Sequence, residues 1–537
     1  MMIAVENIEL YRYEIHSLLQ AFYPQEKIKV FVGEPDVRKY PGPAFLRVDF
    51  SADRIEMSIF PEGAPLSGTD QSVPAAEDKI VPSSGDLREK ASEETFAGSV
   101  RAEETLAESV RAEETLTRSV RAPEGVSLDQ KSAACKTAAK HLLYGMLCDY
   151  TGKTMPWGEL IGIRPTKIAM ARLREGDSVE EAARYMETEH LVSREKAVLA
   201  AQIAERERKI LSGIHYENGF SLYVGIPFCP TTCLYCSFTS YPLSSWKTRV
   251  GEYLDALERE MAASAPMFEG RILDTLYIGG GTPTTLEPEE SERLIRMIRQ
   301  YFDTGALQEF TVEAGRPDSI TAEKLKALKE CGVSRISVNP QTMRDRTLKL
   351  IGRQHTAAQT EEAFHLAREA GFDNINMDII LGLPGETAGD VSYTIDKIRE
   401  LGPDDLTVHS LAVKRASGLS KWIEKNGFSS IMNTDESMEI AARGAAQMGM
   451  SPYYLYRQKN MSGNFENVGY AADGKAGIYN ILIMEEKQSI LALGAGSISK
   501  GVFPGGRIER CDDAKEVAVY IDHIDEMIAR KKRLFGG

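Results

Sequence analysis

The chain has 537 residues, of which 42% are apolar and 27% charged, and its formal net charge is −15. This length exceeds one compact core, so two or three domains are expected. The acidic balance argues against broad nucleic-acid binding, and no run approaches the roughly 18 apolar residues of a membrane helix. The start of the chain predicts no secretory signal, and seven cysteines are too few for a disulfide framework. We therefore expect a cytoplasmic protein without a membrane span, in which clustered cysteines bind metal.

Residues 1–215 predict an N-terminal α+β domain. Apolar–polar alternation at 28–32 and in FLRVDFSA and RIEMSIF, within the first 60 residues, predicts strands. Residues from 61 to about 125 are rich in Pro, Gly, Ser and acidic residues, and they contain the decapeptide repeat EETFAGSVRA, EETLAESVRA, EETLTRSVRA at 93–122. Ten residues are not a whole number of helical turns, so no lasting apolar face forms. We expect a solvated insertion, flexible or frayed-helical, with a partner-binding element as the alternative.

Three helical segments follow this insertion. The pattern at 128–150 predicts a helix in which Cys135 and Cys148 are buried apolar residues. The segment GIRPTKIAMARL (162–173) predicts a helix start near its proline. Its Arg164 and Lys167 belong either to a solvated helix end or to an anion contact. Residues 180–212 predict further helix.

From about residue 219, short β-rich runs alternate with amphipathic helices. Six consecutive βα units predict an α/β fold with a parallel sheet, a partial barrel over 216–415, and residues 416–537 predict a small C-terminal α+β extension. In parallel barrels the reactive groups lie at the carboxyl ends of the strands. The six expected strands are SLYVGI (221–226), DTLYIG (274–279), EFTVEA (309–314), SRISVN (334–339), NINMDII (374–380) and LTVHSL (406–411).

The strongest chemical motif follows the first of these strands. Cys229, Cys233 and Cys236 lie within eight residues, and three thiolates can hold a soft metal centre. A structural zinc site would require a fourth ligand, and the remaining cysteines near this region are solitary. We therefore favour a four-iron cluster with one open iron over zinc.

A run of three glycines, followed by Thr282 and Pro283, ends the second expected strand. Glycine permits close approach of the backbone to a ligand. A tight turn between strand and helix, without a ligand, is the alternative.

These motifs resemble a known family. The C-x3-C-x2-C spacing is similar to that of the radical S-adenosylmethionine superfamily. YIGGGTPTTL, TVEAGRPDSI, RISVNPQT, LIGRQHT, NINMDIILGLPGET and LGAGSIS resemble, in order, the blocks of the oxygen-independent coproporphyrinogen III oxidases. The N-terminal extension and the GIRPTK and YYLYRQKNM segments are most similar to the HemZ branch of that family. The resemblance covers about residues 220–500.

The resemblance implies a 4Fe-4S cluster on the three cysteines and one, possibly two, S-adenosylmethionine molecules. Around the first molecule it places Tyr223, Tyr235, Gly280, Gly281, Thr282, Glu313 and Ile498. A second site would use Gln341, Arg353, Asp378 and Ala412. Catalytic side chains beyond these are not assigned by it.

Simple chemistry agrees with part of this set. Carboxylates at strand ends can meet a ribose diol or an amino group, and Arg353 offers a planar fork for a carboxylate. The alternatives are a surface ion pair for Arg353, a turn cap for Gln341 and a buried structural acid for Asp378. Ala412 and Ile498 rest on resemblance alone.

The implied activity is the oxygen-independent oxidative decarboxylation of coproporphyrinogen III to protoporphyrinogen IX by a 5′-deoxyadenosyl radical, an oxidoreductase reaction of heme biosynthesis. The implied partners are a tetrapyrrole or heme and a reductant such as flavodoxin or ferredoxin. The alternative is a heme chaperone that retains the cluster, because Phe238 stands where the oxidases carry a further cysteine. Asn339 and Pro340 also replace a Gly-Val pair before the family glutamine.

A tyrosine-rich stretch, with Tyr453, Tyr454 and Tyr456 beside Arg457 and Lys459, follows the βα units. It predicts either a bed for a tetrapyrrole and its propionates or a half-exposed strand. His355 and His409 are expected near the strand tops, as hydrogen-bonded structural residues or as ligands of heme or substrate.

Overall fold

The computed structural model describes residues 2–24, 26–33, 45–60, 79–80, 115–122, 127–162, 164–238, 240–414, 417–427, 431, 433–457 and 465–536. The chain divides into two compact units, one of residues 1–161 with 185–196 and one of residues 162–184 with 197–537. The division therefore falls earlier than the expected boundary at 215. Helix α3 (Thr166–Glu175) and most of α5 (Arg194–Ile210) belong to the second unit, and α4 (Val179–His190) is divided between them. Across the described ranges, no helix is both long and apolar enough to cross a membrane.

The first unit is a six-stranded sheet with the strand order β2-β1-β3-β4-β6-β5. The parallel pairs β1/β2 and β1/β3 are followed by antiparallel pairs of β4 with β3 and β6. Two helices, α1 (Arg12–Phe22) and α2 (Ala133–Thr151), bury their apolar faces in the core shared with this sheet. The strands are β1 (Met2–Glu6), β2 (Ile28–Val32), β3 (Leu46–Phe50), β4 (Arg54–Ile59), β5 (Lys79–Ile80) and β6 (Leu116–Arg121).

Two expectations for this unit need correction. Helix α1 was not predicted, although Ile15, Leu18, Leu19 and Phe22 have helical spacing and are all buried. The third decapeptide repeat is not part of a solvated insertion, because residues 116–121 pair antiparallel with β4 and bury Val120. Strand pairing satisfies the backbone groups that a flexible segment would leave to water. The first two repeats lie outside the described residues, whereas Cys135 is buried as expected and Cys148 is half-buried against the same core.

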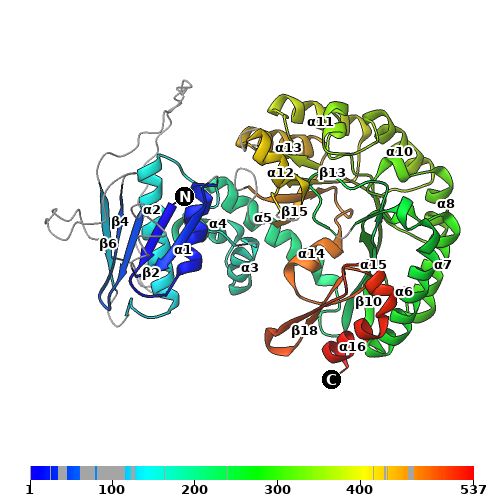
Figure 1. Ribbon diagram of the computed structural model, residues 1–537, viewed down its shortest axis with the longest axis horizontal. Helices are drawn as coiled ribbons and strands as arrows, with labels where there is room; N and C mark the ends of the chain where they lie inside the picture. The colour runs from blue at the N-terminus through cyan, green and yellow to red at the C-terminus, as the bar shows by residue number, and fades with distance from the viewer. Residues whose placement is uncertain are drawn as a thin grey trace. The chain divides into compact units, whose positions relative to one another are not determined.

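The second unit is built on an eleven-stranded sheet. Its centre is a run of six parallel strands in the order β14-β13-β12-β11-β10-β7, which confirms the partial barrel of six βα units. Figure 1 shows α6, α7, α8, α10 and α11 following one another along the outside of these strands. The strands are β7 (Gly219–Ile226), β10 (Ile272–Gly280), β11 (Glu309–Glu313), β12 (Arg335–Ser337), β13 (Ile375–Leu381) and β14 (Asp405–Ser410).

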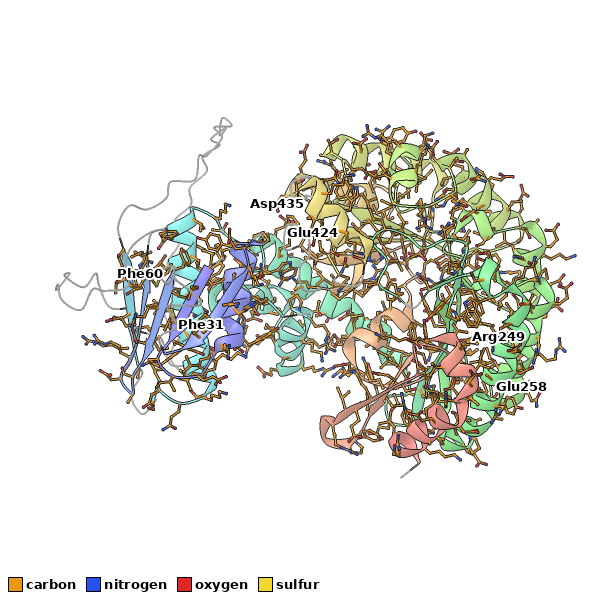
Figure 2. The ribbon with its side chains drawn as sticks, viewed as in Figure 1. Phe31, Phe60, Arg249, Glu258, Glu424 and Asp435 are labelled. Carbon is orange, nitrogen blue, oxygen red and sulfur yellow. The ribbon has the colours of Figure 1, made fainter. Side chains whose placement is uncertain are left out.

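Helices α6, α7, α8, α10 and α11 match the expected amphipathic segments, whereas α9, α12 and α13 were not predicted. Each buries its apolar face, whereas charged side chains such as Glu258 of α6 face outward (Figure 2). The helices are α6 (Val250–Ser264), α7 (Pro288–Tyr301), α8 (Ala322–Glu330), α9 (Asp345–Leu350), α10 (Ala357–Glu369), α11 (Ala388–Leu401), α12 (Gly418–Asn426) and α13 (Asp435–Gln447).

The C-terminal residues form an α+β extension that continues the same sheet, within the second compact unit rather than as a unit of their own. Strands β15 (Ser451–Tyr456) and β16 (Asn467–Ala471) continue the sheet antiparallel beyond β14. At the other edge, β17 (Ser489–Leu493) adds a seventh parallel strand beside β7. Beyond it, β18 (Ile498–Val502) and β19 (Ile508–Asp512) are antiparallel. The remaining helices are α14 (Ile478–Glu485), α15 (Val517–Asp522) and α16 (Ile524–Phe535).

The GIRPTK segment contacts an anion of the protein itself. Pro165 precedes the first residue of α3 as expected. Arg164 Nη2 and Lys167 Nζ lie 2.6 and 3.3 Å from Oε2 of Glu486, so the anion-contact alternative describes both residues.

Candidate metal centre and cofactor site

The three clustered cysteines lie in the loop after β7, where Cys229 ends the short strand β8 (Phe228–Cys229). All three are half-buried. The loop is tied to the segment after α9, because the backbone N–H of Leu234 donates to the carbonyl of Ile351 at 2.9 Å and Thr231 Oγ1 donates to the carbonyl of Gly352 at 3.0 Å. The cysteines therefore lie at the carboxyl ends of the parallel strands, where the sequence placed them.

Each sulfur has a hydrogen-bond donor beside it. Thr282 Oγ1 donates to Cys229 Sγ at 3.4 Å, and Arg316 Nη1 donates to Cys233 Sγ at 3.7 Å. The Phe238 backbone and the Ser240 hydroxyl bond to the Cys236 sulfur. Burial raises the pKa of Cys229 to about 11 and also raises that of Cys236, so without a metal both thiols hold their protons at neutral pH. Within the described ranges, no three His, Cys, Asp or Glu side chains are placed to hold one metal ion.

The glycine strip packs directly against the cysteine loop. Gly280 has φ +108°, a conformation that favours glycine, and a Cβ on Gly281 would lie 2.6 Å from the carbonyl oxygen of Phe228. The N–H groups of Gly281 and Thr282 donate to the carbonyls of Ile226 and Phe228 at 2.7 and 2.8 Å. The glycines are thus required for backbone packing at this turn, whatever else they contact.

Glu313 ends β11 as expected and carries a perturbed carboxyl group. Tyr277 Oη donates to its Oε1 at 2.5 Å, and a Cβ on Gly279 would lie 3.0 Å from the same carboxyl. Burial raises the pKa of Glu313 to about 7, against the opposing effect of the Tyr277 hydrogen bond. Tyr223 stacks on Tyr277, with 6.1 Å between the ring centroids. Tyr223, a predicted site residue, therefore lies beside the tyrosine that donates to Glu313.

The structure brings together two residues of the second predicted group, Gln341 and Asp378. The Gln341 N–H donates to the Asp378 carbonyl at 3.0 Å. Arg353 is buried, and its guanidinium donates to Tyr235 Oη at 3.2 Å and to the Gly315 carbonyl at 2.5 Å. Arg353 is therefore not a surface ion pair but a link between the cysteine loop and the end of β11. Gln341 has φ +67°, a strained conformation for a residue other than glycine.

Asp378 is not at a strand end, which corrects the expectation. It lies in the middle of β13, because pairing with β14 continues to Leu381. Its Oδ2 is 3.7 Å from His409 Nε2, and His409 Nδ1 is 3.4 Å from Tyr456 Oη. Burial alone would raise the pKa of Asp378, but hydrogen bonds from His409, Asn376 and Thr407 lower it below its ordinary value. His409 is thus half-buried between the Asp378 carboxylate and the Tyr456 hydroxyl.

Two predicted residues have no side-chain contact that bears on the prediction. Ala412 follows β14 by two residues and is half-buried. Ile498 begins β18, two strands from β7, and its side chain is 51% exposed.

The tyrosine stretch forms strand β15, as one of its two interpretations predicts, but its central residues are buried rather than half-exposed. Tyr453 and Tyr454 are buried in β15, and Tyr453 donates to Asp405 at 2.9 Å. Arg457 is also buried, and burial lowers its pKa to about 10. Lys459 lies outside the described residues. His355 is buried as well, 3.9 Å from Asp318.

The residues at this centre fit the cofactors that the motifs imply. Three thiols within one loop are ligands for an iron–sulfur cluster. Two buried polar atoms, Gln341 Oε1 and Arg353 Nε, have no hydrogen-bond partner, and buried groups of this kind normally have one. A ligand with carboxylate, amino and hydroxyl groups, such as S-adenosylmethionine, offers the missing donor and acceptor.

Comparison with known proteins agrees with this chemistry. Residues 223–398 match the model of the radical SAM superfamily. The chain is 39% identical over 409 residues to the oxygen-independent coproporphyrinogen-III oxidase-like protein HemZ of Bacillus subtilis, with 74% of this chain and 82% of that protein covered. The chain belongs to the HemZ family of radical SAM proteins.

Other members of the superfamily match a shorter part of the chain. The heme chaperone HemW of B. subtilis is 43% identical over 195 residues, and the oxygen-independent coproporphyrinogen III oxidase of Escherichia coli is 35% identical over 196 residues. Each match covers 36% of this chain, and 51% and 42% of those proteins respectively. Membership of the radical SAM superfamily implies a 4Fe-4S cluster and S-adenosylmethionine for this HemZ-family chain.

Two residues of this centre were missed from the sequence. Tyr277 contacts Glu313, and Arg316 contacts Cys233. Only Tyr277 carried a local signal, because it shares a strand face with Gly279. The contacts of Arg316 depend on a neighbouring loop that sequence spacing does not locate.

Proposed function

We propose that this protein is a radical S-adenosylmethionine oxidoreductase that converts coproporphyrinogen III to protoporphyrinogen IX without oxygen. Two propionate groups would each lose carbon dioxide, one hydrogen atom and one electron to become vinyl groups. The name of the Bacillus HemZ protein supports this substrate class. When bound, the cluster and S-adenosylmethionine supply the one-electron chemistry that removes hydrogen from an unactivated carbon.

The protein's own residues would have different roles, which depend on where they lie in the site. Cys229, Cys233 and Cys236 would hold the cluster, and Glu313, poised by Tyr277, would accept hydrogen bonds from S-adenosylmethionine. The unpartnered atoms of Gln341 and Arg353 would serve the same ligand or a second copy of it. A flavodoxin or ferredoxin in a cytoplasmic setting would provide the electron.

The observation that supports the substrate assignment is an unpaired cation in the segment that follows β14, four residues after its end. Lys414 is half-buried, and burial alone lowers its pKa. Among the residues that the structure describes, no carboxylate pairs with its ammonium group. A buried charge without a partner is costly, and a propionate of a tetracarboxylate substrate would provide one. Lys414 therefore replaces Arg457 as our candidate for the propionate contact.

The test is an anaerobic assay with reductant, S-adenosylmethionine and coproporphyrinogen III, comparing the wild type with Lys414→Met. We expect vinyl product from the wild type and a KM for porphyrinogen raised by about tenfold in the variant, which corresponds to about 1.4 kcal/mol. Lys425→Met, on the exposed face of α12, is the matched control and should leave KM unchanged. No vinyl product despite an intact cluster would reject the proposal.

A second function is favoured by one observation, the exposure of Phe238. This side chain is 77% exposed two residues after Cys236, and a flat apolar ligand such as heme could cover it. The resemblance to HemW agrees with that reading. In this case we expect stoichiometric heme binding that survives gel filtration, weakened by Phe238→Ser, and no decarboxylation. Loss of heme on the column would reject a chaperone role.

A further inference from the structure

The guanidinium of Arg316 contacts the cysteine loop from a neighbouring βα loop. Arg316 follows β11 by three residues and is 4% exposed. Its Nη1 donates to Cys233 Sγ at 3.7 Å and to the Thr231 carbonyl at 3.2 Å, and its Nη2 donates to Thr231 Oγ1 at 3.1 Å. The side chain therefore holds both a sulfur and the backbone of the loop that carries it.

Asp318 fixes the other edge of the same guanidinium. Its two carboxylate oxygens accept from Arg316 Nε and Nη2 at 2.9 and 2.7 Å. With these bonds, all five N–H donors of an arginine are used, so the orientation of the fork is set. Burial lowers the pKa of the nearby His355 to about 3, so this imidazole is neutral and adds no charge to the pair.

The donor at Cys233 differs in kind from those at the other two sulfurs. Cys229 receives a threonine hydroxyl, and Cys236 receives a backbone N–H and a serine hydroxyl, all of them neutral. At Cys233 the donor is the positively charged guanidinium of Arg316, which contacts the sulfur directly. The compensating carboxylate of Asp318 contacts the guanidinium through Nε and Nη2. Hydrogen bonds to sulfur and local charge are the factors through which a protein sets the potential of an iron–sulfur cluster.

We propose that Arg316 is a positioning residue of the cluster, which orients the Cys233 sulfur and raises the cluster's reduction potential. A nearby positive charge stabilises the reduced, more negative cluster more than the oxidised one, so the electron is easier to add. Asp318 opposes this effect through its charge while it holds the guanidinium in place. The inference rests on the proposed cluster cysteines, but it does not depend on which tetrapyrrole is the substrate.

The test is a redox titration of the cluster followed by EPR, without S-adenosylmethionine or tetrapyrrole, on protein whose iron content has been counted. For Arg316→Met we expect the ratio of reduced to oxidised cluster at a fixed potential to fall by about tenfold, which corresponds to about 59 mV for one electron. For Asp318→Asn we expect the opposite shift, because a negative charge is removed while the contacts to Thr231 remain. Arg316→Lys, which keeps the charge without the fork, should lie between Arg316→Met and the wild type.

Arg346→Met is the matched control, since Arg346 is an exposed arginine whose guanidinium pairs with Asp390 and, among the described residues, contacts no cysteine sulfur. Its potential should equal that of the wild type. Shifts in the same direction for Arg316→Met and Asp318→Asn, or no shift in either at full iron content, would overturn the proposal. If Arg316→Met cannot be loaded with iron, Asp318→Asn decides alone, and an unchanged or lower potential refutes the electrostatic effect. Wild-type protein that holds no iron would refute the cysteine assignment itself.

Discussion

Replacing Lys531 with methionine should lower the free energy of unfolding of the second unit. The loss should exceed that caused by replacing an exposed charged residue in the same unit. Lys531 is fully buried in α16, and its Nζ is 2.6 Å from Glu260 Oε1 and 2.6 Å from Asp513 Oδ1. Glu260 in turn accepts the N–H of Gly494 at 2.9 Å, and Asp513 accepts the hydroxyl of Ser497 at 2.8 Å. The ammonium therefore supports the loop that leads into β18.

The expected cost follows from the Glu260 carboxylate, which the variant leaves without its cation, and from the Asp513 carboxyl group, which loses a hydrogen-bond donor. Breaking a buried ion pair by removing one partner costs about 3–5 kcal/mol. The free energy of unfolding can be measured in urea by tryptophan fluorescence, because Trp246 and Trp422 report on the second unit. Arg259→Met, which breaks an exposed pair with Asp525, is the control and should cost at most about 1 kcal/mol. Equal losses in the two variants would refute the reasoning.

Three further predictions concern the same unit. Burial and the Glu260 charge raise the pKa of Asp513 to about 8. The folded state therefore keeps a proton that the unfolded chain releases near pH 4, so the free energy of unfolding should fall as pH rises between these values. Urea titrations should show a shallower fall for Asp513→Asn, and identical slopes would contradict this. Tyr277→Phe removes a hydrogen bond that lowers the pKa of Glu313. The pH midpoint of S-adenosylmethionine binding, measured by calorimetry, should therefore move upward from about 7. An unchanged midpoint would argue against a role for this carboxylate. Gly281→Ala should lower the iron content, because its Cβ would meet the Phe228 carbonyl, whereas Gly251→Ala in α6 has open space and should not; full iron in both variants would contradict the packing argument.

The sequence predicted the barrel well because its strands are short, apolar and separated by amphipathic helices. All six parallel strands were located within a few residues of their observed ends. It did not predict that β17 joins the sheet beside β7, since that pairing connects segments more than 260 residues apart. The sequence did not predict helix α1, because the neighbouring segments alternate apolar and polar residues as strands do. The helical spacing of Ile15, Leu18, Leu19 and Phe22 was overlooked.

For the site, motif spacing located the cysteines and Glu313 but not what surrounds them. The donor to Cys233 comes from Arg316, and the neighbour of Asp378 is His409, both through contacts between separate βα units. The tyrosine stretch forms a strand as expected, but the sequence did not show that Tyr453 and Tyr454 are buried in the core. Burial of Arg457 likewise follows from tertiary packing, which a charged residue type does not reveal.

The account depends most on the three cysteines and the cluster they are proposed to hold. The most direct measurement is an iron count with EPR on anaerobically purified wild type and Cys233→Ala. We predict about four irons per chain and a reducible cluster signal in the wild type, with loss of both in the variant. Zinc in place of iron, or thiols that take up no iron on reconstitution, would contradict the central claim.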